Sequence, residues 1–249
     1  MNDILRSIVS TGVTVLEDGS SAKVHSHAGP AHGELIRNAV AACQPRTACE
    51  VGLAFGISTL YILDAMHSCG DGLLVGMDPA QHDPTWRGGG LHNVKRAGFT
   101  ESYEFHEEPS QVVLPRLAAE GRRIQFAYLD GWHTFDHTLV DFFFVDQMLD
   151  PGGIVILDDV GYPGLRRACH FIVTNRDYEV FGSVPRDGVQ GWRSSVKGVV
   201  RRVLHPLTRT DLSPSATSTE IEGAVDSSAV IALRKVGSDS RSFDHFVHF

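Results

Sequence analysis

The sequence predicts an α/β protein built on a parallel sheet that helices cover. Short apolar segments typical of buried strands alternate along the chain with segments of helical periodicity, which is the pattern of such folds. Glycine and proline residues often lie between these segments, as expected of turns. The 249 residues, 42% hydrophobic and 21% charged, can bury a sizeable core and exclude collagen-like or wholly disordered chains. We expect one α/β domain with one insertion.

Strands and helices are expected to alternate from residue 32 to residue 157. The predicted helices are the amphipathic segments His32–Cys43, Ile57–His67, Leu91–Ala97, Gln111–Glu120 and Phe135–Leu149. The predicted strands are the short apolar segments Thr47–Val51, Leu73–Met77, Ser102–His106, Ile124–Leu129 and Ile154–Leu157. Pro115 is unfavourable inside its helix, and the sequence Asp150-Pro-Gly-Gly153 predicts a stop and a turn before the last of these strands.

The pattern changes after Val160. A helix is expected near Gly164–Asn175, followed by strands at Tyr178–Val184 and Ser228–Lys235. Residues 186–227 form the insertion. Its first part has a Val/Leu stripe at helical spacing from 196 to 207, with basic residues around it, and could contact an anionic membrane, a partner subunit or the domain itself. Its second part, residues 208–227, is rich in Ser and Thr and predicts a flexible surface loop.

The charge balance limits the possible partners. Lys and Arg number 22 against 30 Asp and Glu, a formal net charge of −8, which disfavours broad nucleic-acid binding. The first ten residues do not resemble a secretory signal, and no apolar run is long enough to span a membrane. The four cysteines are scattered without metal-binding spacing. We therefore expect reduced thiols, a cytoplasmic location, no nucleic-acid partner and no stable membrane insertion.

A glycine loop follows the first strand of the alternating series. In Glu50-Val-Gly-Leu-Ala-Phe-Gly-Ile-Ser-Thr59, Gly52 and Gly56 allow close approach of the backbone to a ligand, and the following helix offers free N–H groups. Ala54 stands where a dinucleotide fingerprint has its second glycine, which counts against an NAD-linked oxidoreductase. The loop alone is also compatible with an ordinary strand-to-helix turn.

Two further polar positions follow strand ends. Asp78 ends the second strand of the series and could accept hydrogen bonds from ribose hydroxyls, or could serve as a turn or helix-capping carboxylate. Ser110 and Gln111 follow the third strand, although Ser110 could equally be the N-cap of the next helix. All these positions lie at the carboxyl edge of the predicted sheet, where such folds bind ligands.

Three aspartates end the next two strands. Asp130 follows the fourth strand, and Asp158 and Asp159 follow the fifth, so a parallel sheet would bring them to one edge. Carboxylates brought together raise one another's pKa or bind a cation, and oxygen ligands favour Mg²⁺, with Ca²⁺ or Mn²⁺ as alternatives. They could instead cap helices or orient a cofactor through water.

Histidines provide candidates for proton transfer. His133, three residues after Asp130, has an ordinary pKa that suits proton removal near neutral pH, although a loop histidine could simply bond to the backbone. Trp132 beside it could line a pocket or pack against the domain. His25, His27 and His32 lack the neighbouring cysteines of a zinc site, and we expect residues 1–30 to cover a substrate or cofactor instead.

Taken together, these motifs resemble the S-adenosylmethionine site of class I methyltransferases. The segments Leu129-Asp-Gly-Trp-His133 and Leu149-Asp-Pro-Gly-Gly-Ile-Val-Ile-Leu-Asp-Asp-Val160 narrow the resemblance to metal-dependent small-molecule O-methyltransferases of the catechol and macrocin type. The resemblance covers residues 31–235 except the insertion. It implies a Rossmann-like, seven-stranded, mostly parallel sheet with helices on both faces and an antiparallel last strand, in a methyltransferase domain spanning residues 31–249.

The resemblance also implies roles for individual residues. Glu50 and Gly52 would face the methionine end of S-adenosylmethionine, Asp78 the ribose, and Ser110 with Gln111 the adenine. The expected cofactor contacts are Glu50, Gly52, Gly56, Ser58, Asp78, Ser110, Gln111 and Asp130. The metal ligands would be Asp130, Asp158 and Asp159, although relatives often have Asn or Glu at one of the adjacent pair.

The expected activity is methyl transfer to a hydroxyl group of a sugar, a glycosylated natural product or a catechol-like molecule. Asp130 and His133 would be the catalytic residues, and His133 would be the general base. A vicinal diol could chelate the cation with two oxygens. A homo-oligomer is possible. The alternatives are an NAD-linked oxidoreductase, a binding protein without catalytic activity, and a cofactor-binding relative with another reaction, such as hydroxylation.

Overall fold

The protein is organised around one seven-stranded sheet. The structure, a computed structural model, describes residues 1–25, 28–186 and 218–249. The strand order is β5-β4-β3-β6-β7-β9-β8. The strands are β3 (Thr47–Val51), β4 (Leu73–Met77), β5 (Tyr103–His106), β6 (Ile124–Leu129), β7 (Leu149–Leu157), β8 (Tyr178–Pro185) and β9 (Ser228–Lys235). All seven lie where the sequence predicts strands.

The strand directions confirm the predicted Rossmann-like sheet. Neighbours from β5 to β7 pair in parallel, whereas β9 pairs antiparallel with both β7 and β8. The last strand is therefore the antiparallel one, as expected. The carboxyl ends of β3, β4, β6 and β7 meet at one edge, and this arrangement places the glycine loop, Asp78 and the three aspartates near one another.

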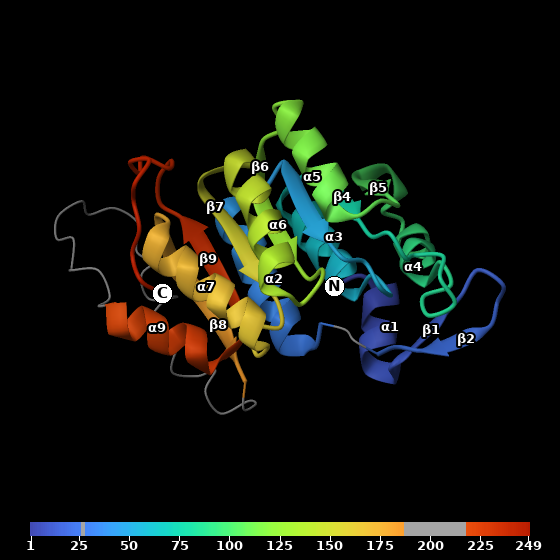
Figure 1. Ribbon diagram of the computed structural model, residues 1–249. Helices are drawn as coiled ribbons and strands as arrows, with labels where there is room; N and C mark the ends of the chain where they lie inside the picture. Colours follow the sequence, from blue (N-terminus) through green and yellow to red (C-terminus); the bar gives the residue numbers. More distant parts are fainter. Residues whose placement is uncertain (26–27, 187–217) are drawn as a thin grey trace.

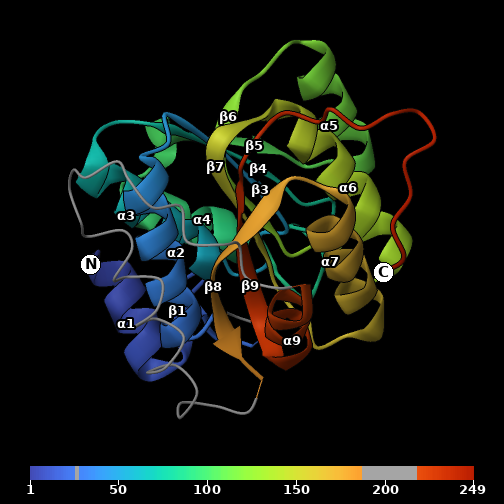
Figure 2. The ribbon, with the colours of Figure 1, turned by 90° about the vertical axis from the view of Figure 1, so that its left-hand side faces the viewer.

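Helices cover both faces of the sheet (Figure 1; Figure 2). The helices are α2 (Pro30–Cys43), α3 (Ile57–Cys69), α4 (Gly89–Arg96), α5 (Ser110–Ala119), α6 (Phe135–Met148) and α7 (Pro163–Asn175). Alternate strand residues divide between two hydrophobic cores, because successive side chains point to opposite faces. Phe126 and Tyr128 of β6 pack in the core that includes α2 and α3, whereas Ala127 and Leu129 pack in the core with α5, α6 and α7.

Two local predictions were wrong. Strand β7 begins at Leu149, not Ile154, because Leu149 pairs with Ile124 before a register shift; the predicted stop at residues 150–153 lies inside the strand. Residues 218–227 form helix α9 (Ser218–Ser227), where a flexible loop was predicted. Val225 of this helix is fully buried, and α9 packs on α7. The predicted basic stripe at residues 193–207 lies outside the described residues.

The N-terminal residues contain elements that the sequence analysis did not identify. Helix α1 (Asp3–Thr11) precedes an antiparallel hairpin of β1 (Val13–Val15) and β2 (Ser21–Lys23), and a short 3₁₀ turn, η1 (Thr100–Ser102), precedes β5. Helix α1 contacts α3, and β1 contacts α4, so the N-terminus lies on the side of the sheet that carries the glycine loop's helix (Figure 2). None of the described helices combines the length and apolar character that crossing a membrane requires.

Candidate active site

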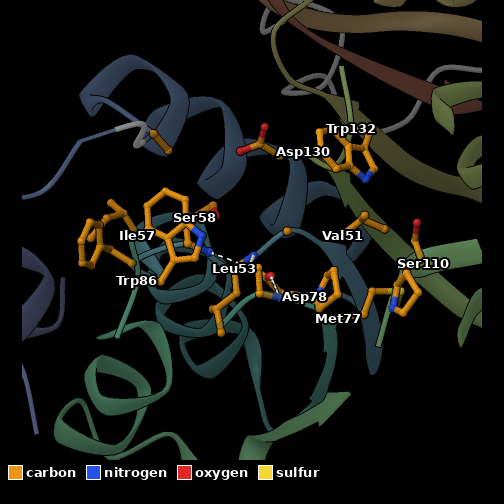
Figure 3. Close-up of a pocket in the computed structure, with 18 of the residues that line it drawn as sticks. Val51, Leu53, Ile57, Ser58, Met77, Asp78, Trp86, Ser110, Asp130 and Trp132 are labelled. Carbon is orange, nitrogen blue, oxygen red and sulfur yellow. Dashed lines mark hydrogen bonds between the residues drawn. The ribbon is translucent and has the colours of Figure 1, made fainter. Parts of the chain in front are cut away.

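A cavity of about 330 Å³ lies at the carboxyl edge of the sheet (Figure 3). Four loops that follow β3, β4, β5 and β6 line it, together with Ala28 and Trp86. Its volume is within the range of small-molecule sites. Of the residues predicted to contact a cofactor, those that line the cavity are Gly52, Ser58, Asp78, Ser110, Gln111 and Asp130.

The glycine loop has a backbone that few other sequences could form. Gly52 has φ of +90°, and a Cβ atom there would lie 2.2 Å from the carbonyl oxygen of Asp130. Gly56 also has positive φ, at +75°, and is the N-cap of α3. Glycine tolerates both the left-handed conformation and the close approach. The two glycines therefore set the backbone conformation of the part of the cavity wall that this loop forms.

Asp78 holds this loop from the neighbouring strand. Its Oδ2 atom accepts hydrogen bonds from the backbone N–H groups of Leu53 (3.0 Å) and Ala54 (3.1 Å), and its Oδ1 atom accepts one from Ala80 (2.8 Å). The side chain is 7% exposed and lines the cavity. Asp78 thus acts as a turn carboxylate, which is one of the alternative roles that the sequence suggested. The same side chain also lines the cavity, where a ribose could bind.

Ser110 and Gln111 line the cavity, and Figure 3 shows Ser110 on the side opposite Trp86. The N-cap of α5 is Pro109, and Ser110 is the first helical residue. The alternative of Ser110 as N-cap is therefore wrong. Ser110 lines the cavity, and its hydroxyl group does not cap α5.

Glu50 and Gly56 do not line the cavity. Glu50 is fully buried behind the loop, where its Oε2 atom accepts a hydrogen bond of 2.6 Å from the Thr59 hydroxyl. Burial raises the pKa of Glu50 to about 8, and its Oε1 atom has no hydrogen-bond partner. Glu50 is accordingly a mostly protonated acid at neutral pH in this state of the protein.

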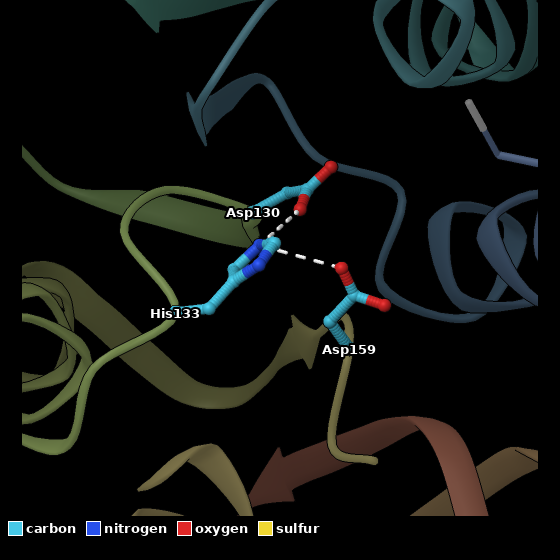
Figure 4. Close-up of side chains that lie close together, drawn as sticks. All are labelled: Asp130, His133 and Asp159. Atoms are coloured by element: carbon cyan, nitrogen blue, oxygen red, sulfur yellow. Dashed lines mark hydrogen bonds and ion pairs between the residues drawn. The ribbon is translucent and has the colours of Figure 1, made fainter. Parts of the chain in front are cut away.

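Asp130, His133 and Asp159 form a compact cluster beside the cavity (Figure 4). The Nε2 atom of His133 lies 3.3 Å from Oδ1 of Asp130 and 3.4 Å from Oδ2 of Asp159. One atom from each of the three residues lies within 4.8 Å of the others, close enough to share a metal ion. Asp130 and Asp159 are thus brought together as predicted, and His133 joins them.

The cluster perturbs the ionisation of its members. Burial is the main cause that raises the pKa of Asp130 to about 6. The hydrogen bond to Asp130 is the main cause that raises the pKa of His133, and the negative charge of Asp159 adds to it. Burial of the Asp130 carboxylate, and the hydrogen bond and negative charges around the His133 imidazole, thus favour the protonated forms of these two groups.

Asp158 does not share this cluster. Its buried carboxylate accepts hydrogen bonds from the Tyr128 hydroxyl and from the backbone N–H of Asp159, and it lies 3.6 Å from Nε2 of His32. Burial, the largest single effect, opposes its ionisation, but the bond and charge of His32 together with the hydrogen bonds from Tyr128 and the Asp159 N–H outweigh it, and the pKa of Asp158 is lowered. Asp158 thus connects the end of β7 to the first turn of α2.

Sequence reasoning did not identify the cavity-lining Trp86 or the neighbour of His133, Tyr162. The ring of Tyr162 stacks on the His133 ring, with centroids 5.0 Å apart, and no spacing rule in the sequence indicates this contact. Trp132 is 69% exposed at the rim of the cavity and lines it, so its role is at the surface and not in a core.

Comparison with known proteins supports the methyltransferase resemblance. A family model described as a methyltransferase domain matches residues 49–160, the segment that holds the glycine loop and all three aspartates. No protein in the curated set matches the chain. This segment is thus similar to a methyltransferase domain, in agreement with the resemblance of its motifs.

Solved structures confirm the predicted fold. An O-methyltransferase from Bacillus cereus in complex with SAH is 14% identical, with a TM-score of 0.60, and the match covers 94% of this chain and 92% of that one. The O-methyltransferase TomG from Streptomyces achromogenes, in complex with SAM, is 18% identical over 74% and 84% of the two chains (TM-score 0.57). The SAH-bound Podospora anserina methyltransferase PaMTH1 is 15% identical over 94% and 88% (TM-score 0.54).

Proposed function

We propose that this protein, which carries a methyltransferase domain, transfers the methyl group of S-adenosylmethionine to a hydroxyl group of a small molecule. The acceptor class is a sugar, a glycosylated natural product or a catechol-like molecule, and a divalent cation assists the reaction. One observation carries the proposal: Asp130 lines the cavity and also belongs to the cluster with His133 and Asp159. A bound cofactor and a bound acceptor would therefore meet at Asp130.

The cavity offers a place for each part of the methyl donor. The loop at Gly52 and Ser58 would contact the methionine end, with Glu50 and Gly56 shaping the loop from behind. Asp78 would accept a hydrogen bond from a ribose hydroxyl through the Oδ1 lone pair that the Ala80 N–H leaves free. Ser110 and Gln111 would contact the adenine, at the side of the cavity away from Trp86.

The donor atoms of the cluster suit a hard divalent cation. Asp130 and Asp159 each offer a carboxylate oxygen, and such ligands favour Mg²⁺, with Mn²⁺ or Ca²⁺ as alternatives. The carboxylate of Asp158 adds negative charge next to these two ligands. It also accepts a hydrogen bond from the backbone N–H of Asp159 and so helps to orient Asp159. A cation bound there would lower the pKa of the acceptor hydroxyl and fix its direction of attack.

His133 is placed to remove the proton of the acceptor. Its imidazole borders both carboxylates and the cavity-lining Asp130, within reach of a hydroxyl bound at the cluster. The free carboxylates favour the protonated form of His133, and a cation bound to them would remove that stabilisation. The neutral imidazole that results is the form that accepts a proton. Tyr162 keeps the ring in place by stacking.

Residues 1–30 would cover one end of the cavity. Ala28 lines it, and the ring of His25 contacts Phe55 and Trp86, both of which also line it. We include this segment in the site as a cover for the methyl donor. The cytoplasmic location, the absence of a nucleic-acid partner and a homo-oligomeric state stay predictions from the sequence.

Calorimetric titration tests the cofactor first. SAH and NADH are each titrated into the protein with and without Mg²⁺; binding of SAH in preference to NADH is expected. Methyl transfer from labelled S-adenosylmethionine to a panel of catechols and sugars is then measured with Mg²⁺ and with excess chelator. Full activity in chelator would remove the cation from the proposal, and preferred binding of NADH would overturn it.

Two histidines on neighbouring turns provide a matched comparison for the base. His133→Gln should lower methyl transfer by about 100-fold or more while SAH binding changes little, since a general base contributes on this scale. His137→Gln changes the same side chain one turn later, where it bonds to Thr134 outside the cluster, and should retain most activity. Equal activity of the two variants would exclude His133 as the base.

A further inference from the structure

Two arginine side chains lie at the turn that follows β7. The turn runs from Asp159 to Tyr162, and the Tyr162 N–H closes it with a hydrogen bond of 2.9 Å to the Asp159 carbonyl oxygen. The Nη2 atom of Arg166 donates a hydrogen bond of 3.4 Å to the Gly161 carbonyl oxygen. The Nε atom of Arg186 lies 3.7 Å from the position that a Cβ atom of Gly161 would occupy. Both side chains therefore reach one residue of a turn that begins with a member of the carboxylate cluster.

The backbones of the two arginines are held by different elements. Arg166 lies on the first turn of α7. Arg186 directly follows β8, and its N–H donates a hydrogen bond of 2.8 Å to the carbonyl oxygen of Ser227, just before β9. The turn is bonded to the same end of β9, since the Val160 N–H donates to the Ala229 carbonyl oxygen at 2.8 Å. The two arginines thus come to the turn from α7 and β8, and hydrogen bonds to β9 hold both the turn and Arg186.

Neither guanidinium group is paired with an acid. Within residues 1–25, 28–186 and 218–249, no carboxylate oxygen lies within 4.0 Å of Arg166 or Arg186. Other arginines of this acidic chain are paired, for example Arg116 with Glu108 and Arg123 with Asp150. Arg166 is partly buried and Arg186 is exposed, so both keep N–H donors available to an anion from outside the protein.

The same turn connects the arginines to the cluster. Its first residue, Asp159, is a proposed cation ligand, and its last, Tyr162, stacks on the His133 ring and is 51% exposed. An acceptor held at the cluster by its hydroxyl can therefore place a second group at Gly161. The aspartates would repel a free anion, whereas an anionic group on a bound acceptor meets the arginines at a high effective concentration.

We propose that Arg166 and Arg186 bind an anionic group of the acceptor, so that the preferred acceptor is a hydroxylated acid and not a neutral sugar or catechol. The inference rests on the proposed function, because it assumes that the reacting hydroxyl lies at the cluster. The N–H groups of a guanidinium match the oxygens of a carboxylate or a phosphate, and either group fits this chemistry. The two arginines would determine specificity and take no part in the methyl transfer itself.

The test compares acids with neutral acceptors of similar shape. 3,4-Dihydroxybenzoate is compared with its methyl ester, and glucuronate and glucose 6-phosphate are compared with glucose. Each is titrated calorimetrically into the protein loaded with SAH and Mg²⁺, and its methylation is measured with S-adenosylmethionine. We expect at least one acid to bind about 10-fold or more tightly than its neutral partner, because hydrogen bonds between charged groups are strong. The sugar acids distinguish a carboxylate from a phosphate.

Two variants and a neighbouring control identify the residues. Arg166→Gln and Arg186→Gln should each weaken binding of the preferred acid by about 10-fold and leave its neutral partner within about 2-fold, an effect of charge that a structural role would not produce. In turnover the change should fall on KM and not on kcat, since the anionic group lies away from the reacting hydroxyl. Arg167→Gln alters the next residue of α7, whose guanidinium lies over the Phe249 ring at 4.9 Å, and should keep the wild-type preference.

The possible results are distinct. If SAH does not bind, the proposed function fails. If SAH binds but no acid binds more tightly than its neutral partner, or if the preference is the same in both arginine variants as in the wild type, the inference is overturned while the proposed function stands. Melting temperatures identify a variant that fails to fold; Arg186 is exposed, so Arg186→Gln tests the proposal even if Arg166→Gln unfolds.

Discussion

Gly52 and Asp130 touch through their backbones across the neighbouring strands β3 and β6. The carbonyl oxygen of Asp130 lies where the first side-chain atom of any other residue at position 52 would be, at 2.2 Å from an ideal Cβ. The loop that lines the cavity and the residue that opens the carboxylate cluster are therefore in direct contact. A displacement of one is expected to displace the other.

Replacing Gly52 by Ala tests this contact. Gly98 provides the control, because it also has a left-handed backbone but has open space around its missing side chain. Gly98→Ala should cost about 1 kcal/mol of unfolding free energy, from backbone strain alone. Gly52→Ala should cost about 2 kcal/mol more, from the clash, and should abolish SAH binding. Denaturant unfolding and calorimetry measure both, and equal stabilities for the two variants would contradict the close contact.

Asp78→Asn tests how the loop is held. One oxygen of Asp78 accepts two loop N–H groups while the other accepts the Ala80 N–H. The asparagine amide must place an NH₂ group against one of these donors, and a buried donor is then left unpaired at a cost of about 1–3 kcal/mol. We expect SAH to bind about 10- to 100-fold more weakly. Unchanged affinity would show that the loop keeps its shape without this carboxylate.

Glu50 should leave a signature in the pH dependence of stability. Its pKa is about 8 in the folded protein and near 4.5 when exposed, so between these values the unfolded chain releases a proton that the folded chain keeps. The free energy of unfolding that depends on protonated Glu50 is therefore fully present below pH 4.5, and it is lost as the pH rises toward 8. The slope is at most about 1.4 kcal/mol per pH unit.

The variant Glu50→Gln keeps the shape of the protonated acid and cannot ionise. Urea unfolding of the ligand-free protein at pH 5, 6, 7 and 8 should show a smaller loss of stability for Glu50→Gln than for the wild type. Glu34→Gln, which removes one exposed carboxylate from α2, should follow the wild type. Parallel pH curves for Glu50→Gln and the wild type would show that Glu50 ionises normally.

A buried ion cluster far from the cavity should govern stability without affecting ligand binding. Asp146 of α6 pairs with Arg176, with Lys235 at 3.2 Å, and with the Tyr178 hydroxyl at 2.6 Å. Asp146→Ala would leave buried cations partly unpaired and should cost about 3 kcal/mol. Asp150→Ala removes a half-exposed carboxylate paired with Arg123 and should cost less than about 1 kcal/mol. Similar melting temperatures would argue against the ion cluster.

The regular elements of this fold were predictable because their sequence signals are local. The inner strands β3, β4 and β6 are short apolar segments, as burial on both faces requires. Residues 149–153 were misjudged because a proline and two glycines usually end an element, while pairing with β6 overrides this preference at Leu149. The N-terminal hairpin has strands of three residues, which are too short for a period-2 pattern to be recognised.

The site was predictable to the level of which strand ends meet. Parallel pairing of β6 with β7 brings Asp130 near Asp158 and Asp159, as the alternation of elements indicates. Which of the two adjacent aspartates joins His133 depends on the backbone after the strand, where Asp159 has φ of +54°. Nor could spacing reveal Tyr162 over His133, because this contact depends on how the loops after β6 and β7 pack.

The left-handed backbone of Asp159 limits how this position can change over evolution or in the laboratory. Asparagine, aspartate and glycine adopt that conformation at low cost, whereas larger or β-branched residues do not. Exchange with asparagine would remove one negative charge and keep an oxygen ligand in the same place. The backbone conformation at position 159 therefore allows the negative charge of the cluster to change by exchange of aspartate and asparagine. It does not allow a longer or branched side chain at this position without strain.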